Sequence, residues 1–439
     1  MTISRPCAEI LTRLENAGYK AFLVGGCVRD QLLGRQVHDL DITTSALPEQ
    51  IMEIFSDLTT IPTGLKHGTV TVLHSGEPVE ITTFRVDKGY SDCRRPDSVD
   101  FTDSLEQDLA RRDFTMNAVA MDLRGQLTDP FGGISDIKNG IIRCVGEPEL
   151  RFSEDALRIL RAVRFAAQLG FQIEENTLRA VLDLRENLSH VSRERVRDEL
   201  DKLIMGKNCA QVMLDCREVI AAVIPEFRPC FDFDQHSHYH RYTVYDHIAH
   251  AVGAAPEIPA VRRAMFFHDI GKPPMFTIDE KGEGHFKGHA ALSAEMTQDI
   301  MKRLRFSTSD TELVAQLIAR HSDHISSERQ IKRLISKMGL EGFLLLMEVK
   351  KSDNLAKNDF VLAENTWFDQ CAETARRLVE EENCFSVKDL AVNGSDLMEL
   401  GMKGREIGDC LKKLLELVMD EQLPNHRSAL LNFIKEELK

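Results

Sequence analysis

The sequence lacks the marks of a membrane protein, of a disulfide scaffold and of a cysteine metal site. In its 439 residues no apolar run approaches the roughly 18 residues that a membrane span needs. The ten cysteines include no CxxC pair, which argues against a disulfide framework and a thiolate zinc site. Residues 1–18 alternate apolar and polar side chains at helical spacing, unlike a secretion signal. We therefore expect a cytoplasmic protein that does not cross a membrane.

Positive charge is also scarce, because 55 Lys and Arg face 70 Asp and Glu, for a net charge of −15. This balance disfavours a nucleic-acid partner, since phosphate binding depends on basic side chains. The first third nevertheless concentrates arginines, which predicts a local basic groove on an acidic protein. These arginines are Arg94, Arg95, Arg111, Arg112, Arg151, Arg158, Arg161 and Arg164.

The length predicts several domains, because single hydrophobic cores stop growing at about 250–300 residues. The first ~140 residues predict a mixed α+β domain, with strands at 21–24, 68–74 and 79–85. From about residue 149 the apolar side chains follow a helical period, which predicts one helix over 149–170. The rest of the chain is predicted to be almost wholly helical, with neither repeats nor low-complexity linkers.

Two carboxylates form the first candidate site. The segment LVGGCVRDQLLGRQVHDLDI (23–42) predicts a strand, a glycine turn, a helix and a second strand that carries Asp39 and Asp41. Residues two apart in a strand point to one face, so these carboxylates converge and can share Mg²⁺. Such a site activates a terminal 3′-hydroxyl and neutralises the leaving pyrophosphate.

The glycine turn of this segment is a candidate phosphate site. Gly25 and Gly26 would let the backbone approach phosphate oxygens at the start of a helix, a position that favours anions. Arg29 could add a positive charge. A pair of acids and a pair of glycines are each common in strand ends and turns, so the whole block carries the argument.

The block resembles the polymerase-β-like nucleotidyltransferase superfamily, and in detail its branch of class II tRNA nucleotidyltransferases and poly(A) polymerases. The resemblance implies a third metal-supporting carboxylate, for which Glu80 is the candidate, with a surface charge as the alternative. Two further segments resemble the family's flexible loop and its ribose-contacting motif: YSDCRRPDSVDF (90–101) and LARRDFTMNAVAMD (109–122). In the second, Arg112 fits triphosphate oxygens, Asp113 fits the ribose 2′-hydroxyl, and Asn117 assists.

The segment RFSEDALRILRAVRF (151–165) matches the family's Glu-Asp-x-x-Arg pattern. Asp155 and Arg158, three apart on a predicted helix, share a face and offer an acceptor and a forked donor. The resemblance assigns them to the Watson–Crick edge of the incoming base, and Arg161 joins the nucleotide-binding set. The alternative is an intrahelical salt bridge worth about 0.2–0.5 kcal/mol. The segment SRERVRDEL (192–200) resembles the family motif that braces the hinge, so Glu194 and Arg197 are predicted to be structural.

Histidines and acids recur in five segments that resemble the HD superfamily of metal-dependent phosphohydrolases: QHSHYHRYTVYDHIAH (235–250), MFFHDIGKP (265–273), FKGHAALSA (286–294), LIARHSDH (317–324) and VKKSDNLAKN (349–358). The resemblance implies one metal on His247, His268, Asp269 and Asp353, and a second completed by His289 and His321. This donor set suits a divalent transition metal or Mg²⁺. The predicted activity is weak hydrolysis of 2′,3′-cyclic or 2′-nucleotide phosphates at damaged RNA ends. Other histidines are predicted to be surface or packing residues: His236, His238, His240 and His250.

These motifs together predict a nucleotidyltransferase head (1–143), a neck with the nucleotide-selecting motif (144–208), an HD body (209–380) and a tRNA-binding tail (381–439). In the tail, Lys403, Arg405, Lys412 and Lys413 are predicted to contact the tRNA backbone, or to form a solvated edge. The predicted reaction adds CCA to tRNA from CTP and ATP.

Alternatives are a poly(A) polymerase, an enzyme that adds only CC or only A, an HD phosphohydrolase with an RNA-binding N-terminal domain, and a non-catalytic RNA-binding scaffold. The intact loop between Phe84 and Arg111 favours full CCA addition. The carboxylates disfavour the last two alternatives.

Overall fold

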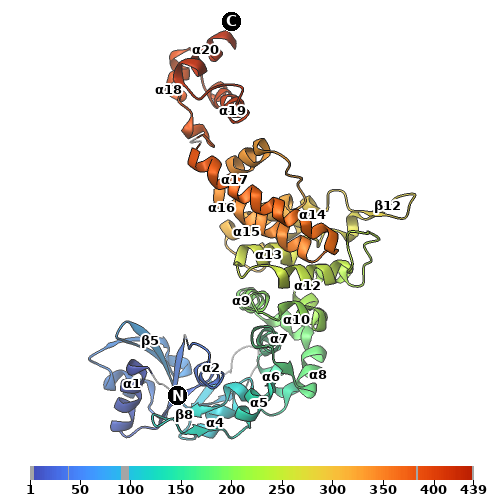
Figure 1. Cartoon of the computed structure of the whole chain (residues 1–439). Coiled ribbons are helices and arrows are strands. Elements are labelled where there is room, and N and C mark those ends of the chain that lie inside the picture. Colours follow the sequence, from blue (N-terminus) through green and yellow to red (C-terminus); the bar gives the residue numbers. More distant parts are fainter. Residues whose placement is uncertain (1–3, 38, 90–97, 382–383, 438–439) are drawn as a thin grey trace. The chain divides into compact units, whose positions relative to one another are not determined.

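The computed structural model describes residues 4–37, 39–89, 98–381 and 384–437. The chain forms two compact units, Met1–Pro225 and Glu226–Lys439 (Figure 1). Most of the predicted flexible loop at 90–101, including Arg94 and Arg95, lies outside the described residues.

A mixed sheet organises the first unit. Among the described residues, seven strands follow the order β3-β4-β5-β2-β1-β8-β9. β2 pairs with β5 in parallel, and every other neighbouring pair of this sheet is antiparallel. The strands are β1 (Ala21–Val24), β2 (Leu40–Thr44), β3 (Thr59–Gly64), β4 (Thr69–His74), β5 (Glu77–Thr83), β8 (Ala120–Met121) and β9 (Leu127–Thr128).

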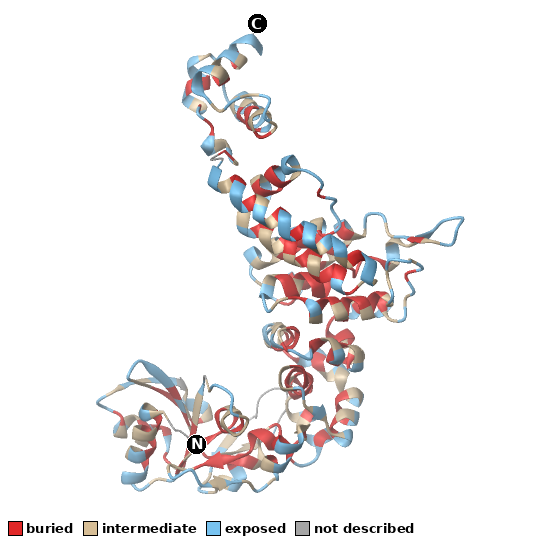
Figure 2. Ribbon diagram, viewed as in Figure 1, coloured by how far each residue is buried: buried red, intermediate tan, exposed pale blue. Residues whose placement is uncertain are grey.

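The two faces of this sheet differ in polarity. Val79 and Ile81 of β5 are fully buried, and they share a core with Ile10 and Leu14 of α1 (Arg5–Asn16). Figure 2 colours the buried segments of this unit red and the exposed ones pale blue. Burying a side chain of this size stabilises the fold by roughly 1.5–3 kcal/mol. Between them on β5, Glu80 is exposed. Alternation along the strand therefore leaves the opposite face of the sheet for polar groups.

The other elements of the first unit are mostly short helices. Two small strand pairs accompany them: β6 (Arg85–Lys88) with β7 (Ser98–Phe101), and β10 (Ile141–Ile142) with β11 (Gln172–Ile173). The helices are α2 (Gly26–Leu32), α3 (Pro48–Ile54), α4 (Leu105–Ala110), α5 (Gly133–Asn139), α6 (Pro148–Glu154), α7 (Leu157–Leu169), α8 (Glu175–Asp183), α9 (Arg193–Ile204), α10 (Cys209–Asp215) and α11 (Arg217–Val223).

The single helix predicted over 149–170 is wrong, because the chain breaks between α6 and α7. Asp155 adopts an extended backbone conformation, with φ −137° and ψ 101°. Its carboxylate accepts the backbone N–H of Leu157 at 3.1 Å, in the manner of a helix-capping side chain. Asp155 and Arg158 therefore do not share a helix face.

Helices make up nearly all of the second unit. Among its described residues, the strands are β12 (Thr277–Ile278) and β13 (Gly284–His285), which form an antiparallel hairpin. The longest helix, α16, is interrupted at Gly339, whose positive φ of 74° suits glycine. The helices are α12 (Val244–Ala254), α13 (Pro259–Phe267), α14 (His289–Arg303), α15 (Thr308–Arg320), α16 (Glu328–Leu355), α17 (Glu364–Glu381), α18 (Gly394–Glu399), α19 (Arg405–Met419) and α20 (Arg427–Glu437).

The last three helices share a small apolar core of their own, which includes Leu397, Leu414 and Leu430. In the described part of the chain, no helix combines the length and the apolar character that spanning a bilayer requires.

Candidate functional site

Three carboxylates meet on the polar face of the sheet. Asp41 of β2 lies directly opposite Glu80 of β5 in the parallel register, so both side chains point to one face. Asp41 is half-buried, whereas Asp39 and Glu80 are exposed. Burial raises the pKa of Asp41, Arg112 opposes that rise, and the charges of Glu80 and Asp39 add to it. The structure thus brings the three predicted carboxylates together.

Gly25 lies next to Asp41 of this acidic site. Its φ of +78° is a conformation that glycine adopts without strain. A β-carbon at this position would lie 3.1 Å from Nη1 of Arg112 and 3.6 Å from Oδ2 of Asp41. The guanidinium and the carboxylate therefore both border the glycine turn, from which α2 begins at Gly26. The turn has the open backbone that a triphosphate needs.

A buried carboxylate, Asp108, connects the acidic strand to the arginines. It accepts the hydroxyl proton of Thr43 on β2 at 2.9 Å and forms an ion pair with Arg111 at 2.8 Å. Arg112 lies 3.6 Å from its other oxygen. Although burial alone would raise the pKa of Asp108, these arginines hold it below the ordinary value.

The predicted ribose and phosphate residues form one chain of contacts. Arg29 donates to Asn117 at 2.8 Å, and Asn117 donates to Asp113 at 3.0 Å. The other oxygen of Asp113 accepts from Nε of Arg161 at 2.8 Å and lies 2.6 Å from its Nη2. Burial opposes ionisation of Asp113, but Arg161 and Asn117 hold its pKa below the ordinary value. Asp113 is therefore a fixed, ionised acceptor.

Next to this chain lies a cavity of about 230 Å³, which we call the base cavity. Asp155 accepts a forked pair of bonds from Arg195 of α9, at 2.8 and 3.3 Å. Arg158 donates to Glu154 at 2.8 Å and to the carbonyl of Arg111 at 2.8 Å. The cavity is lined by Arg111, Arg112, Asp113, Asp155, Leu157, Arg158, Arg161 and Arg195.

The donor chemistry of the sheet site fits magnesium. Mg²⁺ prefers oxygen ligands and is commonly held by one or two carboxylates together with substrate phosphates. Asp39, Asp41 and Glu80 supply only oxygen donors, and the guanidinium of Arg112 borders the same glycine turn as Asp41. The residues present therefore fit Mg²⁺.

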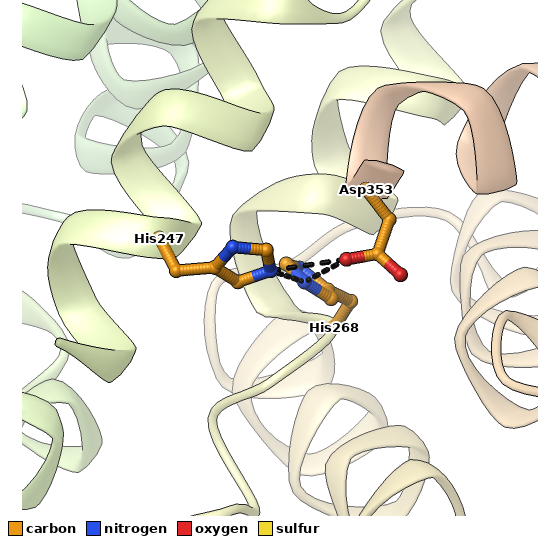
Figure 3. A group of neighbouring side chains, drawn as sticks. All are labelled: His247, His268 and Asp353. Carbon is orange, nitrogen blue, oxygen red and sulfur yellow. Dashed lines mark hydrogen bonds and ion pairs between the residues drawn. The ribbon is translucent and has the colours of Figure 1, made fainter. Parts of the chain in front are cut away.

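A second cluster of metal-type side chains lies in the second unit. His247 of α12, His268 at the end of α13 and Asp353 of α16 point toward one another (Figure 3). Nε2 of His247 lies 3.1 Å from Nε2 of His268 and 3.0 Å from Oδ1 of Asp353. All three side chains are buried.

Asp269 joins this triad to another one. Its Oδ2 lies 3.4 Å from Nε2 of His247, and its Oδ1 lies 3.4 Å from Nε2 of His289 and 3.7 Å from that of His321. Asp269, His289 and His321 form the second triad. Asp269 is almost fully buried, and its Oδ2 also lies 3.2 Å from Nε2 of His268. A carboxylate that bridges two triads in this way suits two metal ions.

Hydrogen bonds at Nδ1 set the ring orientation of the four histidines, His247, His268, His289 and His321. Each Nδ1 lies within 3.2 Å of a backbone carbonyl, and a carbonyl can only accept, so Nδ1 carries the proton. In the neutral rings each Nε2 then presents a lone pair to the centre. The Nε2 atoms of His247 and His268 face each other, as do those of His289 and His321. Because two facing lone pairs repel, each of these two histidine pairs needs a shared proton or a cation between the nitrogens. Metal-ligating histidines commonly show this backbone anchoring.

The pKa values of the histidines differ between the two triads. Burial lowers the pKa of His321 to about 4, whereas Asp269 and Asp353 overcome burial and raise that of His268 to about 9. Lys272 pairs with Asp269 at 2.7 Å, and Lys357 pairs with Asp353 at 2.6 Å.

A cavity of about 930 Å³, the HD cavity, reaches the whole second triad, Asp269, His289 and His321, and Asp353 of the first triad.

Several residues of these sites were not foreseen from the sequence. Asp108 and Arg195 act through contacts with residues distant in the chain, and only the neighbourhood of the family motifs could have drawn attention to them. His240, predicted to be a surface or packing residue, packs its ring 4.9 Å from that of His247 and lines the HD cavity. In the tail, Lys403, Arg405, Lys412 and Lys413 are all exposed.

Three parts of the chain match models of known families. Residues 21–143 match the model of the poly(A) polymerase head domain, residues 170–230 that of an RNA- and SrmB-binding region of polymerase A, and residues 287–434 that of a second domain of tRNA nucleotidyltransferases. The sheet with its carboxylates and the head-domain match define the class as nucleotidyltransferases.

Curated relatives and a solved structure narrow the class. A CCA-adding enzyme of Lactobacillus helveticus is 53% identical over 221 residues, which are 50% of this chain and 54% of that protein. The chain thus spans about half the length of the first curated relatives that it matches. A CCA-adding enzyme of Lactobacillus delbrueckii subsp. bulgaricus is 36% identical over 431 residues, 97% of this chain and 96% of that protein.

The crystal structure of the Bacillus stearothermophilus CCA-adding enzyme in complex with CTP is 30% identical, with a TM-score of 0.77, and the match covers 99% of this chain and 98% of that one. The chain belongs to the family of CCA-adding enzymes.

Proposed function

We propose that this chain adds the 3′-terminal CCA sequence to tRNA, using CTP and ATP. The observation that carries the proposal is the position of Asp41, which lies opposite Glu80 in the sheet and borders Gly25 together with Arg112, a residue that also lines the base cavity. The CTP complex of the Bacillus stearothermophilus relative supports CTP as one substrate.

The chemistry follows from the groups around Gly25. Magnesium bound by Asp39 and Asp41 would lower the pKa of the tRNA 3′-hydroxyl and neutralise the triphosphate, with Glu80 as the third carboxylate. Arg112 and Arg29 would bind phosphate oxygens, since a guanidinium forks onto such groups. Asp113, kept ionised by Arg161, would accept the ribose 2′-hydroxyl, with Asn117 holding it in place.

Base selection is assigned to Asp155 and Arg158 at the base cavity. A carboxylate accepts from the exocyclic amino group that cytosine and adenine share, and a guanidinium donates to the ring nitrogen beside it. Both side chains now have protein partners, Arg195 and Glu154, so an incoming base would compete with these partners.

The sequence-based division remains part of the proposal: head 1–143, neck 144–208, HD body 209–380 and tRNA-binding tail 381–439. The exposed tail cations support tRNA contact, although Arg405 and Lys413 also pair with Asp409 and Glu437.

The direct test supplies the purified protein with tRNA lacking its last three nucleotides, CTP, ATP and Mg²⁺. Addition of C, C and A, then a stop, is the expected result. Arrest after CC, addition of A only to a ready-made CC end, or growth of long A tails would each point to a different member of the family. Asp39→Ala with Asp41→Ala abolishes all addition if the carboxylates have the proposed role.

A second activity, phosphohydrolysis at the HD site, is supported by the two triads bridged by Asp269. Nickel, manganese or magnesium would supply an activated water there. His247, His268, Asp269 and Asp353 would hold one ion, and His289 and His321 with Asp269 the other. The proposed substrates are 2′,3′-cyclic and 2′-nucleotide phosphates at damaged RNA ends.

The HD proposal is tested by metal-dependent hydrolysis of these phosphates by the full chain. Loss of the activity in His268→Ala with Asp269→Ala supports it. Undiminished hydrolysis in that variant refutes the assignment.

A further inference from the structure

An exposed aromatic cluster lies at the edge of the HD cavity. The rings of His238 and Tyr239 lie 4.0 Å apart, and the ring of Phe360 lies 5.6 Å from Tyr239 and 6.1 Å from His238, to which it is nearly parallel. Tyr239 is 48% exposed and Phe360 58% exposed, and contiguous exposed apolar surface of this kind marks an interaction site. His238 and Tyr239 also line the cavity that contains Asp269 and Asp353.

Hydrogen bonds hold this cluster in place. Asn358 donates its backbone N–H to the carbonyl of Tyr239 at 3.0 Å and its side-chain amide to the carbonyl of His238. Glu283 accepts the backbone N–H of His238 at 3.2 Å and lies 3.0 Å from its Nδ1. The aromatic surface is therefore formed before any ligand arrives, which lowers the entropy cost of binding.

The cavity that adjoins the cluster is suited to an anion with an apolar part. Four lysines line it beside the carboxylates: Lys272 and Lys357 pair with Asp269 and Asp353, whereas Lys287 is exposed and can attract phosphate. Its volume of about 930 Å³ lies in the range of roughly 300–1,000 Å³ that small-molecule sites occupy. A phosphate over the triads would leave room for the rest of a nucleotide.

We propose that His238, Tyr239 and Phe360 form a stacking platform for the nucleobase of a ribonucleotide whose phosphate lies over the two HD triads. The inference rests on the proposed phosphohydrolase function and adds a determinant of its substrate. A simple phosphate ester would use the lysines and the triads but not the platform. Stacking of a base on an aromatic side chain contributes about 1–3 kcal/mol and tolerates any base.

The chain carries its own reporter for this site. Trp367 is the only tryptophan, and it lines the same cavity. Its indole N–H donates to the carbonyl of Ile325 at 2.7 Å, which fixes the ring. Fluorescence of the full chain, treated with chelator to prevent turnover, would be titrated with adenosine 2′-monophosphate and, in parallel, with ribose 5-phosphate.

Two variants remove the platform and two controls keep it. Tyr239→Ala and Phe360→Ala should each weaken adenosine 2′-monophosphate binding about tenfold, the fold-change that stacking energies of this size imply. Ribose 5-phosphate binding should not change. Tyr239→Phe keeps the ring and should bind as the wild type does. Tyr242→Ala is the matched control, because Tyr242 stacks on His250 and does not line the cavity.

Unchanged adenosine 2′-monophosphate binding in both alanine variants would overturn the platform, and so would an equal loss for both ligands. A short single-stranded RNA with a terminal 2′-phosphate distinguishes the source of the nucleotide. Tighter binding than the mononucleotide assigns the platform to RNA ends, and equal binding assigns it to free nucleotides. Hydrolysis of p-nitrophenyl phosphate by the metal-loaded chain tests the proposed function separately, because this substrate has no nucleobase.

Discussion

At the scale of single residues, Asp41 differs in environment from the two other carboxylates of the sheet. It is half-buried and faces Gly25 and Arg112, whereas Glu80 is exposed on the neighbouring strand. We expect Asp41→Asn to lower the rate of CMP addition at least about 1,000-fold, since a catalytic metal contributes several kcal/mol to transition-state stabilisation. We expect Glu80→Gln to lower it less. Single-turnover addition with radiolabelled CTP measures both.

Glu77→Gln is the control for Glu80, because Glu77 is exposed on the same strand and pairs with His74 of β4 instead of Asp41. A rate for Asp41→Asn near that of the wild type would contradict the assigned metal site.

Asp113 makes the stability of the protein depend on acidity. Arg161 and Asn117 hold its pKa below the ordinary value of 3.8, against the effect of burial. The folded state therefore stays ionised while the unfolded state takes up a proton, so this stabilisation is full above pH 3.8 and is lost as the pH falls further. We expect the free energy of unfolding to fall more steeply below pH 4 in the wild type than in Asp113→Asn.

Urea unfolding followed by circular dichroism at pH 5, 4 and 3 measures this difference. Glu175→Gln is the control, because Glu175 is 87% exposed in its pair with Arg179, and it should follow the wild type. Parallel curves for wild type and Asp113→Asn would contradict the prediction.

At the scale of elements, the break between α6 and α7 lets the Asp155 side chain bond to Arg195 of α9. The two bonds from Arg195 set the direction of the carboxylate that is proposed to read the base. We expect Arg195→Ala to reduce discrimination between CTP and ATP about tenfold at each step, because a charge-assisted hydrogen bond contributes roughly 1.5–3 kcal/mol. The ratio of kcat/KM for the two nucleotides, measured on tRNA ending before C, CC and CCA, tests this.

Arg197→Ala is the matched control, since Arg197 lies on the same helix and pairs with Asp198 at 2.7 Å. Arg195→Lys should restore part of the discrimination. A loss of rate without a change in the CTP-to-ATP ratio would show that Arg195 supports folding alone.

The strands around the acidic site were predictable from local pattern. β-branched alternation indicated β4 and β5, and the Gly-Gly turn indicated the start of α2. The meeting of Asp41 with Glu80 required the register between two strands, which a sequence period does not contain. The break at Asp155 was missed because the apolar side chains of α6 and α7 continue one helical period across it.

The partners of the candidate residues were harder to predict. Arg195 reaches Asp155 across 40 residues of sequence, and Asp108 reaches Thr43 across 65. Such contacts depend on how helices and strands pack, and no local spacing encodes them. The six HD ligand candidates, by contrast, came from the order of the family motifs, and the structure brings all six together.

At the scale of the whole molecule, the two candidate centres use separate residues in separate compact units. We expect Asp41→Asn to retain HD-site hydrolysis of 2′,3′-cyclic AMP and His321→Ala to retain CCA addition, each within about twofold of the wild type, because sites without shared partners contribute independently. Both activities of both variants would be measured on one preparation. Joint loss of both activities in either variant, with the fold intact by circular dichroism, would contradict two independent centres.

The anchored histidines have a consequence for how the protein would acquire its metal. Four backbone carbonyls hold the rings in their ligating orientation. Zinc fingers, by contrast, need the ion to fold. We therefore expect metal ions to bind to and dissociate from a preformed site, so that the supply of metals in the cell would decide which ion is bound there. Growth conditions would then change the activity of this protein without any change in its sequence.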